Sequence, residues 1–474
     1  MNPPLAAPEF PDGLEWLNSE PILMEEQRGR VVLLAFWCAS SAYSHNLLVD
    51  LQGVLARHSD SVTLVAVHTP KFEAERQARM AQKCLNSLGL RIPLVHDPEF
   101  LLWQHFEVNA WPSVVVIDTT QQLVRLLVGD SVKAELEKLI GDLLEQAGLN
   151  ERVFQSAPTG SKPEPRLPLL FPAGIAANAN RLFVSDTAHH RIVECTHDGR
   201  IMRQIGTGNA GLVDGNSAEA CFNRPRGLFL SRDALYVADS GNHALRRISL
   251  LSGDSDTLAG HGARGSSADM ISEEPLRSGL DSPWSLVGNH DKLYMAMATG
   301  QEIWEYDQGT RRLRVVAGTG QIGLCDGAGE RALLAQPAAL AMIQQTLYVA
   351  ESASSSIRGI NVQGGQVHTL VGHGLFEYGD QDGPRQHALL QCPMGLCLDA
   401  RAPQLWIADS YNNQIRSLRL GGGELRRLAL NYALHEPAAI ASSEGILWVS
   451  NTNAHEVLRI DIDSAQVKRL PIGE

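Results

Sequence analysis

The sequence lacks any apolar segment long enough to cross a membrane. No run approaches the roughly 18 residues that a spanning helix needs. Residues 1–13 have neither a basic start nor an apolar stretch, so no signal peptide is predicted. Excess positive charge is also missing, because the formal net charge is −13. We therefore expect neither nucleic acids nor membranes as partners.

Cysteine is scarce and shows no pairing pattern. The seven cysteines are Cys38, Cys84, Cys195, Cys221, Cys325, Cys392 and Cys397. An odd number of scattered cysteines does not form a disulfide framework, and a reducing cytoplasm is the simplest expectation. Nowhere do two cysteines form Cys-x-x-Cys, and no histidines or cysteines have the spacing of metal ligands. We therefore predict no metal and no cofactor.

The first 150 residues alternate between strand-like and helix-like segments. Residues 31–37 form a continuous apolar run of strand length, and residues 43–56 carry apolar side chains at helical spacing. Residues 72–88 have the composition of one amphipathic helix. This alternation predicts an α/β domain over residues 1–150, with a largely parallel, covered sheet. Residues 151–169 are rich in proline and aperiodic, which predicts a linker.

From residue 170 to residue 474 the chain repeats one unit six times. Each unit has a proline before an apolar strand and an acidic position at the end of a second strand. The prolines are Pro172, Pro225, Pro283, Pro337, Pro393 and Pro437. The second strands end at Asp186, Asp239, Met297, Glu351, Asp409 and Asn451. Third and fourth strands follow, so the repeat predicts an all-β propeller of six four-stranded blades that must close to bury its core.

Two of these units carry a recognisable repeat signature. The segments 235–247 (LYVADSGNHALRR) and 405–416 (LWIADSYNNQIR) resemble NHL repeats. We expect the acidic side chain to accept backbone hydrogen bonds from the turn that follows it. Three connections between units share a Gly-x-Gly and an Asp-Gly, and each Asp lies 11 residues before the unit's proline. These aspartates are Asp214, Asp326 and Asp382.

The first domain resembles the thioredoxin-like fold of the redoxin type. The resemblance rests on residues 28–37 (RGRVVLLAFW) and 109–118 (NAWPSVVVID). It implies a cis peptide bond before Pro112 and a Cys-x-x-Cys at the start of the first long helix. Counting from the Phe-Trp pair places both redox positions at serines, Ser41 and Ser44. Serine cannot form a disulfide, so dithiol exchange at this site is excluded, and Ser41 is predicted to be the helix N-cap.

The domain order resembles the family of NHL repeat-containing protein 2 and its bacterial relatives, whose members commonly keep the Cys-x-x-Cys. We therefore hypothesise a cytoplasmic protein-interaction scaffold with a propeller platform and a degenerate thioredoxin-like domain. Its groove would hold an extended protein or peptide partner by backbone pairing. The predicted contact residues are Ser41, Tyr43, Ser44, Trp111 and Pro112.

Two enzyme hypotheses remain open at this point. Cys38 stands at the end of the first long strand, where a single thiol could serve a thiol oxidoreductase or peroxidase. A metal in the central channel of the propeller is the second alternative, although no histidine recurs at one blade position. His68 and His96 are expected at the rim of the site, and His189 and His190 as polar turn residues. The sequence predicts no oligomeric state.

Overall fold

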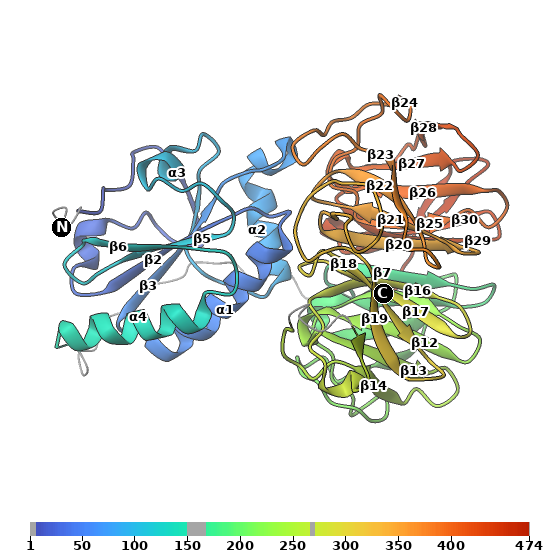
Figure 1. Ribbon diagram of the computed structural model, residues 1–474, viewed down its shortest axis with the longest axis horizontal. Coiled ribbons are helices and arrows are strands. Elements are labelled where there is room, and N and C mark those ends of the chain that lie inside the picture. Colours follow the sequence, from blue (N-terminus) through green and yellow to red (C-terminus); the bar gives the residue numbers. More distant parts are fainter. Residues whose placement is uncertain (1–5, 149–166, 266–270, 474) are drawn as a thin grey trace. The chain divides into compact units, whose positions relative to one another are not determined.

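The computed structural model describes residues 6–148, 167–265 and 271–473. The chain divides into two compact units, residues 1–165 and 166–474, which are described separately (Figure 1). This division falls inside the predicted linker, whose residues 151–166 lie outside the described part of the chain. None of the helices in the described ranges combines the length and apolar character that a membrane crossing requires.

The N-terminal unit contains one mixed sheet with strand order β1-β4-β3-β2-β5-β6. The strands are β1 (Glu15–Leu17), β2 (Val31–Trp37), β3 (Val62–His68), β4 (Leu94–His96), β5 (Ser113–Ile117) and β6 (Leu123–Val128). The helices are α1 (Ala42–His58), α2 (Ala78–Ser87), α3 (Leu101–His105) and α4 (Lys133–Gln146), with two short 3-10 helices, η1 (Met24–Gln27) and η2 (Glu73–Arg76). The central strands β2 and β3 are parallel and buried along their whole length, as predicted for a covered sheet.

Alternate side chains of β2 point to opposite faces of the sheet and fill two apolar cores. Val31, Leu33 and Ala35 pack with residues of α1, α2 and α4. Phe36 and its neighbours on the other face pack with residues of α3 and the segment around Met24. The single helix expected over residues 72–88 is wrong: η2 and α2 are separate, because Glu75 turns inward and binds backbone N–H groups.

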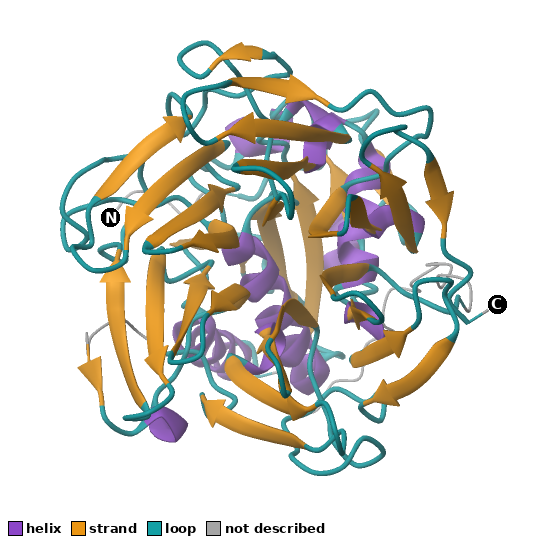
Figure 2. Ribbon diagram, turned by 90° about the vertical axis from the view of Figure 1, so that its right-hand side faces the viewer, coloured by secondary structure: helices purple, strands orange, loops and turns teal. Residues whose placement is uncertain are grey.

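The C-terminal unit is a six-bladed propeller, seen along its axis in Figure 2. The first three blades comprise β7 (Pro172–Ala177), β8 (Leu182–Asp186), β9 (Arg191–Cys195) and β10 (Ile201–Ile205); β11 (Pro225–Leu230), β12 (Ala234–Asp239), β13 (Ala244–Ser249) and β14 (Ser255–Ala259); and β15 (Ile271–Ser272), β16 (Pro283–Gly288), β17 (Lys292–Met297), β18 (Glu302–Asp307) and β19 (Arg312–Ala317). The last three comprise β20 (Pro337–Ile343), β21 (Thr346–Glu351), β22 (Ser356–Asn361) and β23 (Val367–Val371); β24 (Gly383–Pro384), β25 (Gly395–Leu398), β26 (Gln404–Asp409), β27 (Gln414–Arg419) and β28 (Glu424–Arg427); and β29 (Pro437–Ser443), β30 (Ile446–Asn451), β31 (Glu456–Asp461) and β32 (Val467–Arg469). Each blade is an antiparallel sheet of four consecutive strands, with a two-residue strand added to the third and fifth blades.

The ring closes without sharing a strand between its first and last blades. Among the described residues, the last sheet contains only β29 to β32, so the segment before Pro172 adds no strand to it. Leu169 instead packs in an apolar cluster with Leu470 and Ile472. The Phe171 N–H donates to His455 Nδ1 at 3.1 Å, and the Thr452 hydroxyl donates to the Pro172 carbonyl at 2.7 Å. Side-chain packing and hydrogen bonds therefore join the two ends.

The bond to His455 belongs to a set that recurs at all six blade junctions. One side chain after each second strand accepts a hydrogen bond, 2.5–3.2 Å long, from the N–H of the residue before the next blade's proline. The six accepting residues are His190, His243, Gln301, Ser355, Asn413 and His455. These acceptors and their donors all have positive φ values. The left-handed turn on each side brings the two blades within reach of each other.

Three buried arginines fasten the connections between blades. Arg246, Arg358 and Arg416 are fully buried, and each follows the acidic end of its second strand by seven residues. Arg358 donates to Glu351 on its own blade and to Asp326 in the preceding connection, at 2.9 Å each. Arg246 bonds Asp239 and Asp214 in the same way, and Arg416 bonds Asp409 and Asp382. Removing one partner from such a buried pair typically costs about 3–5 kcal/mol.

We expected the blade acids to accept backbone hydrogen bonds from the turn that follows them. That turn instead supplies side-chain donors, such as Asn242 Nδ2 to Asp239, and the backbone donor comes from the segment before the blade proline. Asp239 Oδ1 accepts a hydrogen bond from the Asn223 N–H, two residues before the blade proline. Asp186, Asp409 and Asn451 accept the corresponding bonds in their blades. The antiparallel pairing of the first and second strands explains this difference, because it places Pro225 opposite Asp239.

The junction histidines predict a specific dependence of stability on pH. Burial lowers the pKa of both His190 and His243 from 6.5 to about 4. Between these values the unfolded chain binds protons that the folded protein does not, so the free energy of unfolding falls as the pH falls from 6.5 to 4. Asparagine already serves at one junction, as Asn413, and keeps an acceptor at the same position. Between pH 7 and pH 4.5 the free energy of unfolding should fall in both proteins. We expect this fall to be about 2 kcal/mol smaller in the double variant His190→Asn, His243→Asn than in the wild type.

Urea unfolding of both proteins at the two pH values measures this difference. The comparison isolates the imidazoles, since every carboxylate is common to the two proteins. Equal losses of stability in the wild type and the variant would contradict the role of the two histidines.

Candidate functional site

The predicted site lies where β2 ends and α1 begins. Ser41 is the N-cap of α1, and its hydroxyl accepts a hydrogen bond from the Ser44 N–H at 3.2 Å. The peptide bond between Trp111 and Pro112 is cis. Phe36 pairs with Ser113 across the antiparallel strands β2 and β5. Pro112, which precedes Ser113, therefore lies beside the end of β2. We call the turn 38–41, the first turn of α1 and residues 110–112 the mouth.

The five predicted contact residues are not equally accessible. Ser41, Tyr43 and Trp111 are half-buried, whereas Ser44 and Pro112 are buried. The Ser44 hydroxyl faces inward and accepts a hydrogen bond from the Cys38 N–H at 3.3 Å. A fully buried side chain cannot contact a partner, so the surface of the mouth consists of Ser41, Tyr43 and Trp111, with Ser44 and Pro112 beneath it.

Cys38 lies in the floor of the mouth. Its side chain is 1% exposed, and the Ser40 hydroxyl lies 3.8 Å from its sulfur. Burial, together with the nearby Glu75 carboxylate, raises the pKa of the Cys38 thiol to about 12. Because the nucleophile in thiol chemistry is the thiolate, these surroundings disfavour the redox role considered for Cys38.

Glu75 holds the mouth together by hydrogen bonds, a role that the sequence did not indicate. Its side chain is fully buried and accepts three backbone hydrogen bonds, from Ser40 at 2.5 Å, Lys71 at 2.6 Å and Phe72 at 3.1 Å. Burial raises its pKa, while these N–H groups act in the opposite direction. Glu75 thus ties the turn 38–41 to the segment before α2. A single glutamate in a charged segment carries no sequence signal for this role.

Two histidines support the mouth from inside. His68 and His96 were expected at the rim, but they are 0% and 2% exposed. Their Nδ1 atoms are 3.0 Å apart, and the His96 Nε2 lies 3.0 Å from the Arg76 carbonyl oxygen. Next to His68, the Thr69 hydroxyl accepts a 2.6 Å hydrogen bond from the Trp111 indole. These contacts hold the Trp111 ring in one orientation.

The central channel of the propeller offers no ligands for a metal. Its cavity of about 70 Å³ is lined by the first strands of all six blades. The lining residues are glycine, alanine, serine, methionine, tryptophan and aliphatic residues, and none of them is titratable. Within the described ranges, no cluster of three or more His, Cys, Asp or Glu side chains is arranged to hold a metal ion. The channel therefore does not favour the metal-dependent alternative.

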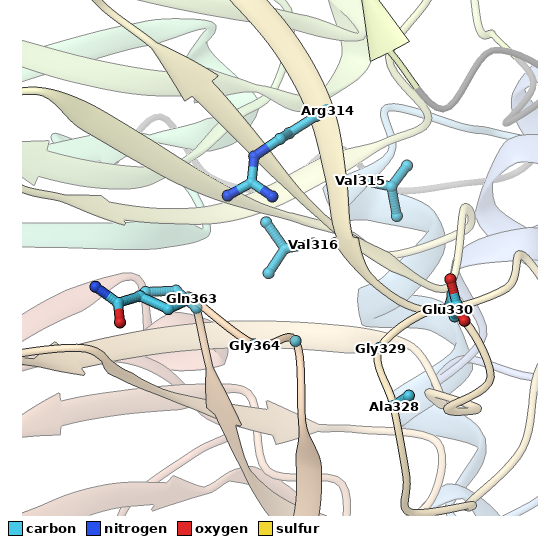
Figure 3. Close-up of a pocket in the computed structure, with 10 residues that line it drawn as sticks. Arg314, Val315, Val316, Ala328, Gly329, Glu330, Gln363 and Gly364 are labelled. Atoms are coloured by element: carbon cyan, nitrogen blue, oxygen red, sulfur yellow. The ribbon is translucent and has the colours of Figure 1, made fainter.

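A larger cavity lies between the outer parts of the third and fourth blades (Figure 3). It has a volume of about 370 Å³ and is lined by residues of β19, of the following connection and of the turn after β22. Arg314 is its one cationic side chain, and its guanidinium binds both oxygens of Glu305, at 2.8 and 2.7 Å. With this charge already neutralised, the Glu330 carboxylate is the other charged group of the lining (Figure 3).

Comparisons with known proteins agree with both units. Residues 29–123 match the family model described as Thioredoxin-like. NHL repeat-containing protein 2 of Homo sapiens is 30% identical over 523 residues, which cover 99% of this chain and 72% of the human protein. The chain belongs to the NHL repeat-containing protein 2 family. The predicted combination of a thioredoxin-like domain and a six-bladed propeller is therefore confirmed.

Two other relatives extend the comparison. Protein SUPPRESSOR OF QUENCHING 1, chloroplastic, of Arabidopsis thaliana is 32% identical over 497 residues, covering 97% of this chain. The chain spans only 47% of that relative's length. Thiol-disulfide oxidoreductase YkuV of Bacillus subtilis is 26% identical over 140 residues, covering 29% of this chain and 94% of that protein. Since one relative is named as chloroplastic, the cytoplasmic location stays a prediction.

The burial of Cys38 leads to a direct test. We expect Cys38 to resist alkylation by iodoacetamide in the native protein at pH 7, because its thiol is buried and its pKa is raised to about 12. Peptide mapping by mass spectrometry should find it labelled only after unfolding. The exposed Cys325 serves as the control that the reagent is active. Labelling of native Cys38 at the rate of Cys325 would contradict the inert role.

Proposed function

We propose that this chain is a protein-interaction scaffold whose thioredoxin-like unit binds an extended polypeptide without thiol chemistry. The observation that carries the proposal is the use of oxygen at both redox positions. Ser41 serves as the cap of α1, and Ser44 serves as an internal acceptor for the Cys38 N–H. Both hydroxyls therefore have structural roles, and the adjacent cysteine is buried and protonated.

The backbone at the mouth supports peptide binding. Within the described part of the chain, neither the N–H nor the C=O of Trp111 forms a hydrogen bond, although the indole N–H does. Trp111 is half-buried as a residue, and a backbone donor and acceptor without partners in the same residue can pair with an extended peptide. The neighbouring carbonyls of Ala110 and Pro112 are bonded to the Ser113 hydroxyl and the Gly129 N–H. Pairing at Trp111 would therefore need no rearrangement of its neighbours.

The propeller suits a platform more than a catalyst. Its channel is narrow and has no titratable lining, whereas its blade connections are fastened by Arg246, Arg358 and Arg416. Two of these connections present apolar side chains to solvent, Val213 at 47% and Ile322 at 46% exposure. We propose that such anchored connections contribute contacts to a partner, in the compartment predicted from the sequence, the cytoplasm.

Peptide binding can be measured with a thiol-free probe. Reduced and carboxymethylated α-lactalbumin is unfolded and has no reactive thiol, so it presents extended segments only. In isothermal titration with the full chain, we expect Tyr43→Ala to weaken binding about tenfold, as is typical for an aromatic contact residue. Val124→Ala, 38% exposed near the other end of β6, serves as the control and should leave the affinity unchanged. No detectable binding by the wild type would contradict the proposal.

Placing cysteines at positions 41 and 44 tests whether the serines are the only feature that separates the mouth from a dithiol redox site. The double variant Ser41→Cys, Ser44→Cys places one thiol at the N-cap of α1 and one three residues later. We expect it to reduce insulin disulfides, with dithiothreitol as the electron source, about tenfold faster than the wild type. Ser41→Cys alone is the control, because one thiol cannot form the internal disulfide. The proposed geometry would be contradicted if mass spectrometry shows the 41–44 disulfide but the double variant reduces insulin no faster than the wild type.

A further inference from the structure

A thiol of α2 meets an imidazole of the mouth, away from the positions of the family's redox pair. Cys84 lies in the last turn of α2, and His45 lies in the first turn of α1. Their Sγ and Nε2 atoms are 3.2 Å apart. Both side chains are half-buried. Neither residue is one of the peptide contacts proposed above.

The Ala39 carbonyl fixes the protonation of the His45 Nε2 atom. The His45 Nε2 lies 2.7 Å from the Ala39 carbonyl oxygen, which can only accept a hydrogen bond. Nε2 must therefore be protonated and donate. The same N–H faces the Cys84 sulfur, whose S–H in the neutral thiol donates to the Ala39 oxygen at 3.8 Å. The sulfur thus receives part of a hydrogen bond, and such a bond is stronger to a thiolate than to a thiol.

The end of the helix does not supply this stabilisation. Cys84 belongs to the C-terminal turn of α2, where the helix dipole disfavours an anion. The hydrogen bond from His45 is therefore the contact that we expect to favour the thiolate.

The remaining cysteines differ from Cys84 in their surroundings. Burial raises the pKa of Cys38 and Cys195 to about 12 and also raises that of Cys397. Cys221 lies 3.1 Å from the Thr207 hydroxyl, and the exposed Cys325 lies beside the Asp326 carbonyl. The sixth, Cys392, is buried. Cys84 combines a half-buried position with an imidazole within hydrogen-bond distance of its thiol.

We propose that Cys84 is a covalent modification site for low-molecular-weight disulfides. The Cys84 thiolate attacks one sulfur of the disulfide, a new S–S bond forms, and the old one breaks. The second sulfur leaves as a thiolate and takes up the proton that Cys84 released. Cys38, the other cysteine of the described N-terminal unit, is too buried and too weakly acidic to resolve the adduct. The mixed disulfide therefore accumulates until a small thiol reverses the exchange.

Oxidised glutathione and the full-length protein provide the test. At pH 7, intact-mass analysis and peptide mapping should show one glutathione on Cys84, formed about tenfold faster than on Cys325. Accessibility alone predicts the opposite order, since Cys325 is exposed and Cys84 is half-buried. His45→Asn should slow the Cys84 reaction about tenfold. Cys325→Ser is the matched control and should leave the Cys84 rate unchanged.

Two results would overturn the proposal. One is a Cys84 rate below that of Cys325 throughout pH 6–9 in the wild type, a comparison that needs no variant. The other is an unchanged Cys84 rate in His45→Asn when thermal unfolding shows that the variant is folded. Because the probe is a small disulfide and the readout is an adduct, loss of peptide binding at the mouth would not affect either outcome.

Discussion

The propeller depends on one hydrogen bond repeated around the ring. No blade buries its own faces, so each is stable only between two neighbours. At every junction a left-handed residue presents a side-chain acceptor to the backbone N–H before the next blade's proline. Histidine, glutamine, serine and asparagine all perform this role, because the backbone geometry matters more than the identity of the acceptor. The bond between Phe171 and His455 shows that the closing junction is made in the same way as the other five.

The N-terminal unit keeps a thioredoxin-like architecture while its mouth has different chemistry. Ser44 and Glu75 bind the backbone around Cys38 from two sides, which holds the turn without a disulfide. The same contacts seal Cys38 from solvent. A site organised this way is suited to recognition, and the nearby thiol with an imidazole neighbour is Cys84, on a different helix.

Much of the architecture was predictable because it follows from local periodicity. The spacing between the proline and the end of the second strand defined all six blades, although Met297 and Asn451 replace the acid in two of them. The Phe-Trp and Trp-Pro segments indicated the first fold and Pro112. Contacts between distant segments were not predictable, such as Glu75 with Ser40 or Cys84 with His45. The inward orientation of Ser44 also depends on tertiary packing.

One missed feature did leave a signal in the sequence. An arginine stands seven residues after the acid in the three blades whose preceding connection carries an Asp-Gly. This coincidence, read as charge pairing, would have located Arg246, Arg358 and Arg416.

The anchoring of these connections has a consequence for sequence variation. Asp326 bonds Arg358 and also accepts a hydrogen bond from the Thr369 N–H. The Cys325 carbonyl accepts from the same arginine at 3.1 Å, and the Gly323 N–H donates to the Leu334 carbonyl at 3.0 Å. Because these are backbone bonds, the connection tolerates a change of an exposed side chain such as Ile322 but not a change of its length.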